Sequence, residues 1–355
     1  MKGFHWKRWL FGILLIVVIG AIADLLGWNI RGWFKELWDT ITTISIGYII
    51  GACVLLIVQT TTTAYAWFSI LRYGYPDAGV RWREVWAAYA ASVALNGILP
   101  ANLGTLMMLL MFTTFIAGAT FAGVIGGYAV EKIFYTLIGA FVYLYLFLTV
   151  GGSFDIKFNF VHAHPWATAI ALIGGALLIW WVMRLLWPRV VKWWDQAKQG
   201  GRILVHPSAY FGRVFFPSFL SWVAMLGVVA VFLAAYNIPV SFHTLMRVVG
   251  GNSIANVTSV TPGGVGVTQA FNVASLKGVT SSQNATAYSV AQQLVTTSWN
   301  ILLGIVLMAW AFGWSGGKRL VTKSYTDAKA KEAEQSAARK AKKQAKEDAK
   351  AAEAG

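Results

Sequence analysis

Cysteine and charged residues are scarce in this chain of 355 residues. The single cysteine, Cys53, excludes an intrachain disulfide and a zinc site built from cysteines. It lies in an apolar run, where cysteine packs as a small apolar residue. Only 12% of the residues are charged, and the longest hydrophilic stretch is the C-terminal tail. We therefore expect no soluble domain in this sequence.

Enzyme signatures are also absent. The sequence has no Walker phosphate loop, no nucleophile elbow and no His-Glu-x-x-His zinc motif. The pair His162-x-His164 has no further ligands nearby, and a zinc ion needs three or four. We therefore expect no metal, no cofactor and no enzymatic activity. An intramembrane transferase would need a catalytic acid or base, and Glu131 is the only carboxylate deep in an apolar segment.

Apolar residues make up 57% of the sequence, and several apolar stretches reach the roughly 20 residues that a helix needs to cross a bilayer. Their continuous character favours helices over the alternating strands of a membrane barrel. The first stretch ends at Ala21-Ile22-Ala23 and resembles a signal peptide, but we interpret it as a transmembrane helix. The sequence predicts an all-α polytopic membrane protein with six full transmembrane helices, at about 9–27, 41–70, 119–150, 166–187, 214–236 and 286–313.

Two further apolar segments, 86–118 and 243–275, contain helix-breaking turns near their middle. Both turns contain the pattern Pro-x-x-x-Gly, as Pro100/Gly104 and as Pro262/Gly266. We interpret each segment as a broken, re-entrant pair of half-helices. Because the two pairs are predicted to enter from opposite faces, we interpret them as an inverted repeat, whose broken helices line a substrate site near the midplane.

The basic residues support this topology. The formal net charge is +15, but the basic residues lie in short flanks beside apolar segments, which is typical of the positive-inside rule and not of nucleic-acid binding. If 86–118 is re-entrant, the basic clusters in 2–8, 72–83, 184–202 and 318–319 all lie on the cytoplasmic side. If it crosses the membrane, the 184–202 cluster lies outside. We therefore expect a multi-pass protein whose N-terminus and C-terminus are both cytoplasmic.

Polar residues in the broken segments and in 119–150 are candidate substrate contacts. Non-helical backbone at membrane depth must be buried or line a wet cavity, and free N–H groups at the start of a half-helix bind anions. Ionised groups as deep as Glu131 and Lys132 mark function by default, and Arg247 could bind phosphate or reach the interface. The predicted substrate-binding residues are Asn96, Asn102, Glu131, Lys132, Arg247, Asn256, Pro262, Gly263, Gly264, Gly266 and Gln269. In the last span, Gln292, Gln293 and Asn300 also suit a polar head group.

Each of these features also has a structural interpretation. The glycine-rich turn can be a tight packing turn, and the amides can hold helices together at about 0.6–2 kcal/mol each. Glu131 can form an ion pair with another helix, for example with Arg247. The tail, 316–355, has 11 Lys/Arg against 6 Asp/Glu. We expect a domain at 1–315 and a basic cytoplasmic tail, helical or disordered, that binds anionic lipid or a cytoplasmic partner, or only aids solubility.

Three blocks carry a resemblance to a known family: "ALNGILPANLGTL", "AVEKIFYTLIGAF" and "SVTPGGVGVTQA". In this order they resemble the lysylphosphatidylglycerol synthase transmembrane-region family, which includes YbhN-like proteins and the flippase portion of the multiple peptide resistance factor. The resemblance implies a polytopic helical protein of the bacterial inner membrane that translocates polar-headed lipids. Glu131 and Lys132 match the family's acidic-basic pair. Asn102, Thr105 and Gln269 replace charged residues of the family pattern.

Two functions follow as hypotheses. The first is a membrane transporter or flippase for an anionic phospholipid or a polyprenyl-phosphate-linked glycolipid precursor, with its site between the two broken segments. The alternative is a non-transporting membrane partner that recruits or regulates a cell-envelope lipid or glycan enzyme through its basic tail. The first predicts that function depends on 262–266, and the second that it depends on 318–355.

Overall fold

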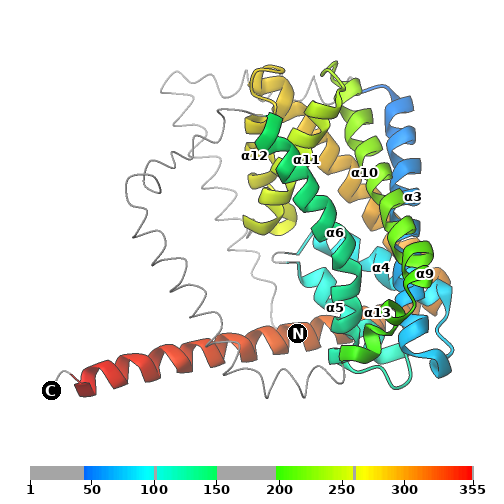
Figure 1. Ribbon diagram of the computed structural model, residues 1–355, viewed down its shortest axis with the longest axis vertical. Coiled ribbons are helices and arrows are strands. Elements are labelled where there is room, and N and C mark those ends of the chain that lie inside the picture. The colour runs from blue at the N-terminus through cyan, green and yellow to red at the C-terminus, as the bar shows by residue number, and fades with distance from the viewer. Residues whose placement is uncertain (1–43, 100–101, 150–196, 259–260, 354–355) are drawn as a thin grey trace.

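The protein is a bundle of helices. The computed structural model describes residues 44–99, 102–149, 197–258 and 261–353, and these residues form helices joined by short turns. The all-α fold class is therefore confirmed. Figure 1 shows the long helices crossing the molecule from top to bottom, with the shorter α4 and α5 in its lower half and α11 and α12 in its upper half.

Four helical stretches are long and apolar enough to cross a bilayer. They are α3 (Ile46–Gly74), α6 (Phe121–Thr149), the stretch Pro207–Ala235 and the stretch Ser282–Asp327. The third joins α9 (Pro207–Tyr210), the π-helical η4 (Phe211–Phe215) and α10 (Phe216–Ala235), and the fourth belongs to α13 (Ser282–Glu353). They correspond to the predicted spans 41–70, 119–150, 214–236 and 286–313. The predicted spans 9–27 and 166–187 lie outside the described residues.

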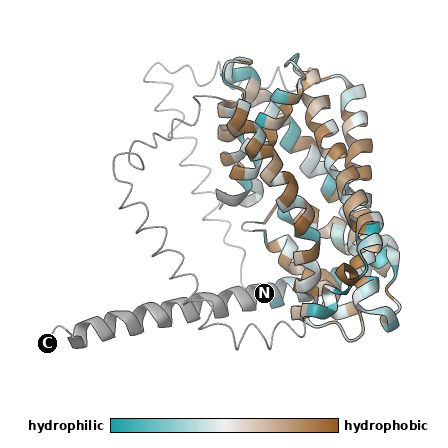
Figure 2. Cartoon of the chain, in the orientation of Figure 1, coloured by the Kyte–Doolittle hydropathy of each residue, from teal (hydrophilic) through white to brown (hydrophobic). Residues whose placement is uncertain are grey.

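The outward faces of these helices are apolar. Leu148 on α6 is 70% exposed, and large apolar side chains stay uncovered along the same helix and along α13. Figure 2 shows brown, hydrophobic residues along much of the outside of the long helices. Water would disfavour such a surface by about 25 cal/mol per Å², whereas lipid accepts it. The exposed residues of this kind include Leu137, Phe141, Leu144, Phe147, Leu302, Ile305 and Val306.

Small residues and hydroxyl groups join the helices in the interior. Helix α4 (Trp82–Asn96) presents an alanine-rich face to α13, and a Cβ added to Gly304 would lie 3.1 Å from Ala94 Cβ. Between α3 and α10, the hydroxyls of Thr63 and Ser221 lie 2.7 Å apart in a buried hydrogen bond. Both features are typical of helix packing in membranes, where close approach and interhelical hydrogen bonds replace the hydrophobic effect.

Both broken segments are helical hairpins. Helix α4 packs against α5 (Leu103–Phe115), and α11 (Phe242–Thr258) packs against α12 (Val267–Ser275). The 15 residues of α4 span about 22 Å at 1.5 Å per residue, which is less than the bilayer core. The breaks lie where the sequence predicts them, because proline and glycine occupy both turns.

Helix α13 bends sharply at Gly313, whose φ of 69° and ψ of 160° are not helical. Beyond the bend the helix runs across the lower end of the bundle and continues to Glu353 (Figure 1). Leu320 and Val321 pack there against the core formed by α3, α4 and α5. The bend lies close to the domain boundary predicted at 315/316, which stays a prediction.

Candidate functional site

The turns of the two hairpins touch each other inside the bundle. A Cβ added to Gly263 would overlap the carbonyl oxygen of Gly97, so only glycine allows this approach. Gly263 also has a positive φ of 61°, which other residues adopt at a cost. From α13, Gln293 Nε2 donates a hydrogen bond of 2.6 Å to Gly263 O. The predicted convergence of the broken segments is therefore present in the fold.

A cavity of about 210 Å³ lies where the turns meet, and we call it the inter-loop pocket. Asn102 and Asn256 are exposed, and their side chains form no hydrogen bond with the described residues. Their amide groups are therefore available to a ligand. The pocket is lined by Asn96, Gly97, Leu99, Asn102, Asn256, Thr261, Gly263 and Gly264.

Asn96 holds the first turn together. Its Nδ2 donates to Thr105 Oγ1 at 3.0 Å, and its Oδ1 accepts from Thr105 N at 3.2 Å. Thr105 N, in the first turn of α5, is shared between this bond and a bond of 3.0 Å to Asn102 O. Asn96 thus lines the pocket while its side chain is already engaged in positioning Asn102 and α5.

Gln269 has the same role in the second turn. Its Oε1 accepts a hydrogen bond of 2.7 Å from Gly266 N, and its Nε2 donates to Gln293 Oε1. Gly264 N donates to Thr261 O at 3.1 Å, within the turn that η5 (Pro262–Gly264) forms. Two of the N–H groups that the sequence suggested for anion binding are therefore engaged within the protein.

A second cavity of about 220 Å³ lies between α3, α4, α10 and α13, and we call it the mid-bundle pocket. Gln292 and Asn300, which the sequence indicated as polar contacts, line it. So does Tyr89, which sequence reasoning missed. The lining comprises Leu56, Gln59, Thr60, Tyr89, Val93, Met225, Val228, Gln292, Thr296 and Asn300.

Glu131 and Lys132 form an ion pair with each other. Glu131 is 3% exposed, and its Oε2 lies 3.1 Å from Lys132 Nζ. Neighbouring helical residues point about 100° apart, but the long lysine side chain bends back to the carboxylate. The Lys132 ammonium also lies 5.0 Å from the ring centres of Tyr128 and Tyr135, which stabilises the cation. Neither charged residue lines the two pockets.

Glu131 belongs to a buried polar cluster. It interacts electrostatically with the phenol groups of Tyr89 and Tyr135, whose hydroxyls interact with Thr63. Tyr135 also interacts with Ser221. Tyr89 also lines the mid-bundle pocket. The polar run "QTTTT" at 59–63, inside an apolar helix, is the sequence signal that could have revealed this cluster.

Arg247 lies apart from both pockets. Its guanidinium donates a hydrogen bond of 3.1 Å to Lys277 O, in the turn that follows α12. It forms no ion pair with Glu131, so the structure does not bear out the pairing of these two residues that the sequence left open. Arg247 instead joins α11 to the turn that follows α12.

The sequence matches the family described as "Lysylphosphatidylglycerol synthase TM region" over residues 9–315, which is most of the chain. The chain belongs to this family. No curated protein and no solved structure matches it. The family and the four apolar helices together make it a membrane-embedded protein connected with lipid or cell-envelope biosynthesis or transport.

Two of the neutral residues that replace charged residues of the resembled pattern have defined hydrogen-bond partners. The Thr105 hydroxyl accepts from Asn96 Nδ2 while the Thr105 backbone N donates to Asn96 Oδ1. The Gln269 side chain both accepts, from Gly266 N, and donates, to Gln293 Oε1. A carboxylate accepts hydrogen bonds but cannot donate them. The bond that Gln269 donates to Gln293 is therefore one that an ionised glutamate could not make, whereas the network at Thr105 needs only a side-chain acceptor.

Proposed function

We propose that the protein is a lipid transporter of the flippase type. It moves an anionic phospholipid or a polyprenyl-phosphate-linked glycolipid precursor across the inner membrane without altering it chemically. The inter-loop pocket is the observation that carries this proposal. A polar cavity between two non-helical turns in a membrane-embedded bundle suits a polar occupant, because non-helical backbone at membrane depth is buried in protein or lines a wet cavity.

The arrangement of the hairpins supports alternating access. In this proposal each hairpin enters from its own face, the two form an inverted repeat, and six full spans surround them with both chain ends in the cytoplasm. Inverted repeats of this kind place the substrate between broken helices and expose it to one face at a time. Figure 1 shows the hairpins in opposite halves of the molecule, as this requires.

The lining of the pocket indicates how a head group is held. Asn102 and Asn256 offer amide donors and acceptors, and the described residues around the pocket carry no charged side chain. Hydrogen bonds from neutral groups suit a phosphate oxygen or a sugar hydroxyl equally. They also hold the group weakly enough for release, which a transporter needs.

Glu131 and Lys132 supply the charges near the path. In this proposal the two residues set the electrostatic environment near Tyr89 and the mid-bundle pocket. They do not contact the lipid in the inter-loop pocket. Burying an ion pair at this depth costs free energy, and a functional role explains why the protein carries it.

The test is transport in liposomes. Purified full-length protein is reconstituted with a labelled anionic phospholipid or a polyprenyl-phosphate-linked sugar, and the head group accessible on each face is followed over time. Asn102→Leu combined with Asn256→Leu should slow transport about tenfold, since one or two hydrogen bonds of about 1 kcal/mol each are lost. Thr114→Leu combined with Thr286→Leu is the control, because these threonine hydroxyls bond only to carbonyl groups of their own helices.

The recruitment hypothesis predicts a different result. If no lipid moves with folded protein, or both double variants transport equally, the inter-loop pocket is not a transport site. Deleting the basic tail beyond Asp327 would then decide whether partner binding depends on it. Loss of partner binding with an intact bundle would favour recruitment of a cell-envelope enzyme.

A further inference from the structure

A basic cavity of about 370 Å³ lies at the lower end of the bundle, separate from both polar pockets. Arg72 comes from the last turn of α3, Arg202 from η3 (Arg202–Val205) and Arg213 from the π-helical η4. Three separate backbone segments thus bring arginines to one opening. The complete lining is Arg72, Tyr73, Pro76, Arg202, His206 and Arg213.

The three arginines have no carboxylate partner among the described residues. Asp77, the nearest acid along the chain, forms no ion pair with them. The guanidinium of Arg213 instead lies 5.7 Å from the ring centre of Tyr73, and that of Arg72 lies 5.9 Å from Phe68. Aromatic faces stabilise the cations but leave their N–H groups unused. Like charges in one cavity repel each other, so an anion is the missing counterpart.

The backbone around the cavity is closely packed. A Cβ on Gly74 would lie 2.9 Å from Gln199 O, and a Cβ on Gly200 would overlap Gly123 O. The segment before Arg202 is thereby fixed against α3 and α6. Arg213 lies in the middle of the π-helix Phe211–Phe215, a widened turn that occurs frequently at functional sites. The cavity is therefore a built feature and not a loose surface loop.

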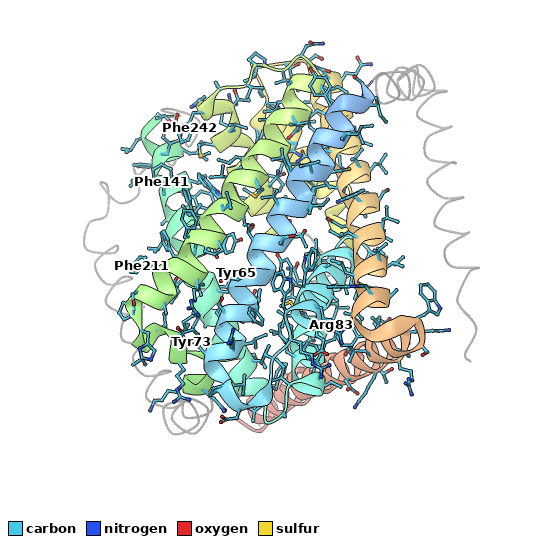
Figure 3. All side chains as sticks on the ribbon, turned by 90° about the vertical axis from the view of Figure 1, so that its right-hand side faces the viewer. Tyr65, Tyr73, Arg83, Phe141, Phe211 and Phe242 are labelled. Carbon is cyan, nitrogen blue, oxygen red and sulfur yellow. The ribbon has the colours of Figure 1, made fainter. Side chains whose placement is uncertain are left out.

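Large apolar side chains stand exposed beside the arginines. Val205 is 74% exposed and Phe211 is 58% exposed, and they alternate along the chain with the cavity residues Arg202, His206 and Arg213. Figure 3 shows Tyr73 and Phe211 on the same lower-left side of the molecule. Arginines next to exposed apolar groups are typical of a surface that meets lipid head groups.

We propose that this cavity binds the phosphodiester group of an anionic phospholipid, with the acyl chains lying over Val205 and Phe211. The guanidinium groups of Arg72, Arg202 and Arg213 can each donate two parallel hydrogen bonds to two phosphate oxygens. A lysine ammonium does not offer this geometry. The site is distinct from the inter-loop pocket, and it stands whether or not the protein transports lipid.

The experiment measures lipid retained by the full-length protein. Detergent-solubilised protein is incubated with phosphatidylglycerol or with phosphatidylcholine of the same chains, and bound lipid is counted by native mass spectrometry. The triple variant Arg72→Gln, Arg202→Gln, Arg213→Gln should lose the preference for phosphatidylglycerol about tenfold, because charge-assisted hydrogen bonds are removed. The single variant Arg213→Gln, which changes only one residue of the fold, should lose part of it.

The control is Arg81→Gln, Arg83→Gln, Arg319→Gln. It removes the same charge from other exposed positions, and Figure 3 shows Arg83 well away from Tyr73. It should keep the preference. Equal losses in both triple variants, or no preference in the unaltered protein, would overturn the proposal. A second outcome would also overturn it. If inorganic phosphate stabilises the protein against heat through the three arginines, but phosphatidylglycerol binding does not depend on them, the site serves a soluble phosphate.

Discussion

At the scale of the residue, Gly263 decides how closely the two hairpins approach. Its positive φ and its contact with Gly97 O exclude a side chain for two separate reasons. Gly278 shares only the first reason, because its φ is 80° but a Cβ there would meet nothing within 4 Å. Comparing substitutions at Gly263 and Gly278 therefore separates the free-energy cost of backbone strain from that of steric overlap.

Gly263→Ala should therefore destabilise the protein more than Gly278→Ala does. Both substitutions cost about 1–2 kcal/mol for the left-handed backbone. Only the first also pushes the turns apart and should abolish most transport. Thermal unfolding and liposome transport of both variants measure the difference. Equal effects of the two substitutions would mean that the contact between the turns is not needed.

The ion pair on α6 yields a second prediction. Lys132→Met leaves the buried Glu131 carboxylate unpaired and should cost about 3 kcal/mol. The double variant Glu131→Gln, Lys132→Met removes both charges and should recover most of that loss. A double-mutant cycle on thermal stability measures the coupling between the two residues. Simple addition of the two single effects would show that the pair does not interact.

At the scale of the helix, the contact between α4 and α13 is set by small residues. Gly304→Leu should destabilise the bundle by about 1–3 kcal/mol, because the added atoms meet Ala90 and Ala94. Gly139→Leu on α6 is the matched control, since a Cβ there would meet nothing within 4 Å. Denaturation in detergent compares the two. If the control loses as much, side-chain volume at the α4–α13 contact is not the cause.

The same scale shows what the sequence can and cannot predict. The hairpin breaks were predictable, because Pro100 and the glycines after Pro262 end helices by local chemistry. The partner of Gln269 was not, because Gln293 lies 24 residues away and only the packing of α12 on α13 brings them together. Arg247 was equally ambiguous: its chemistry suits phosphate, but the fold directs it to Lys277 O.

At the scale of the whole molecule, the opposed hairpins predict which loops face which side. In a Cys53→Ser background, Asp77→Cys follows α3 and Lys277→Cys follows α12. A membrane-impermeant maleimide should label them from opposite faces, with Asp77→Cys reached from the cytoplasm. Labelling of both after denaturation is the control. Labelling of both from one face would contradict the inverted arrangement.

The contact between Gly97 and Gly263 also has an electrical consequence. In the proposed topology each hairpin admits water from its own side, so the insulating layer between the two aqueous compartments is thin there. The membrane voltage then falls mostly across this short distance instead of across the full bilayer. A head-group charge passing the two glycines would experience nearly the whole drop, about 2.3 kcal/mol per 100 mV, within a few ångströms of travel.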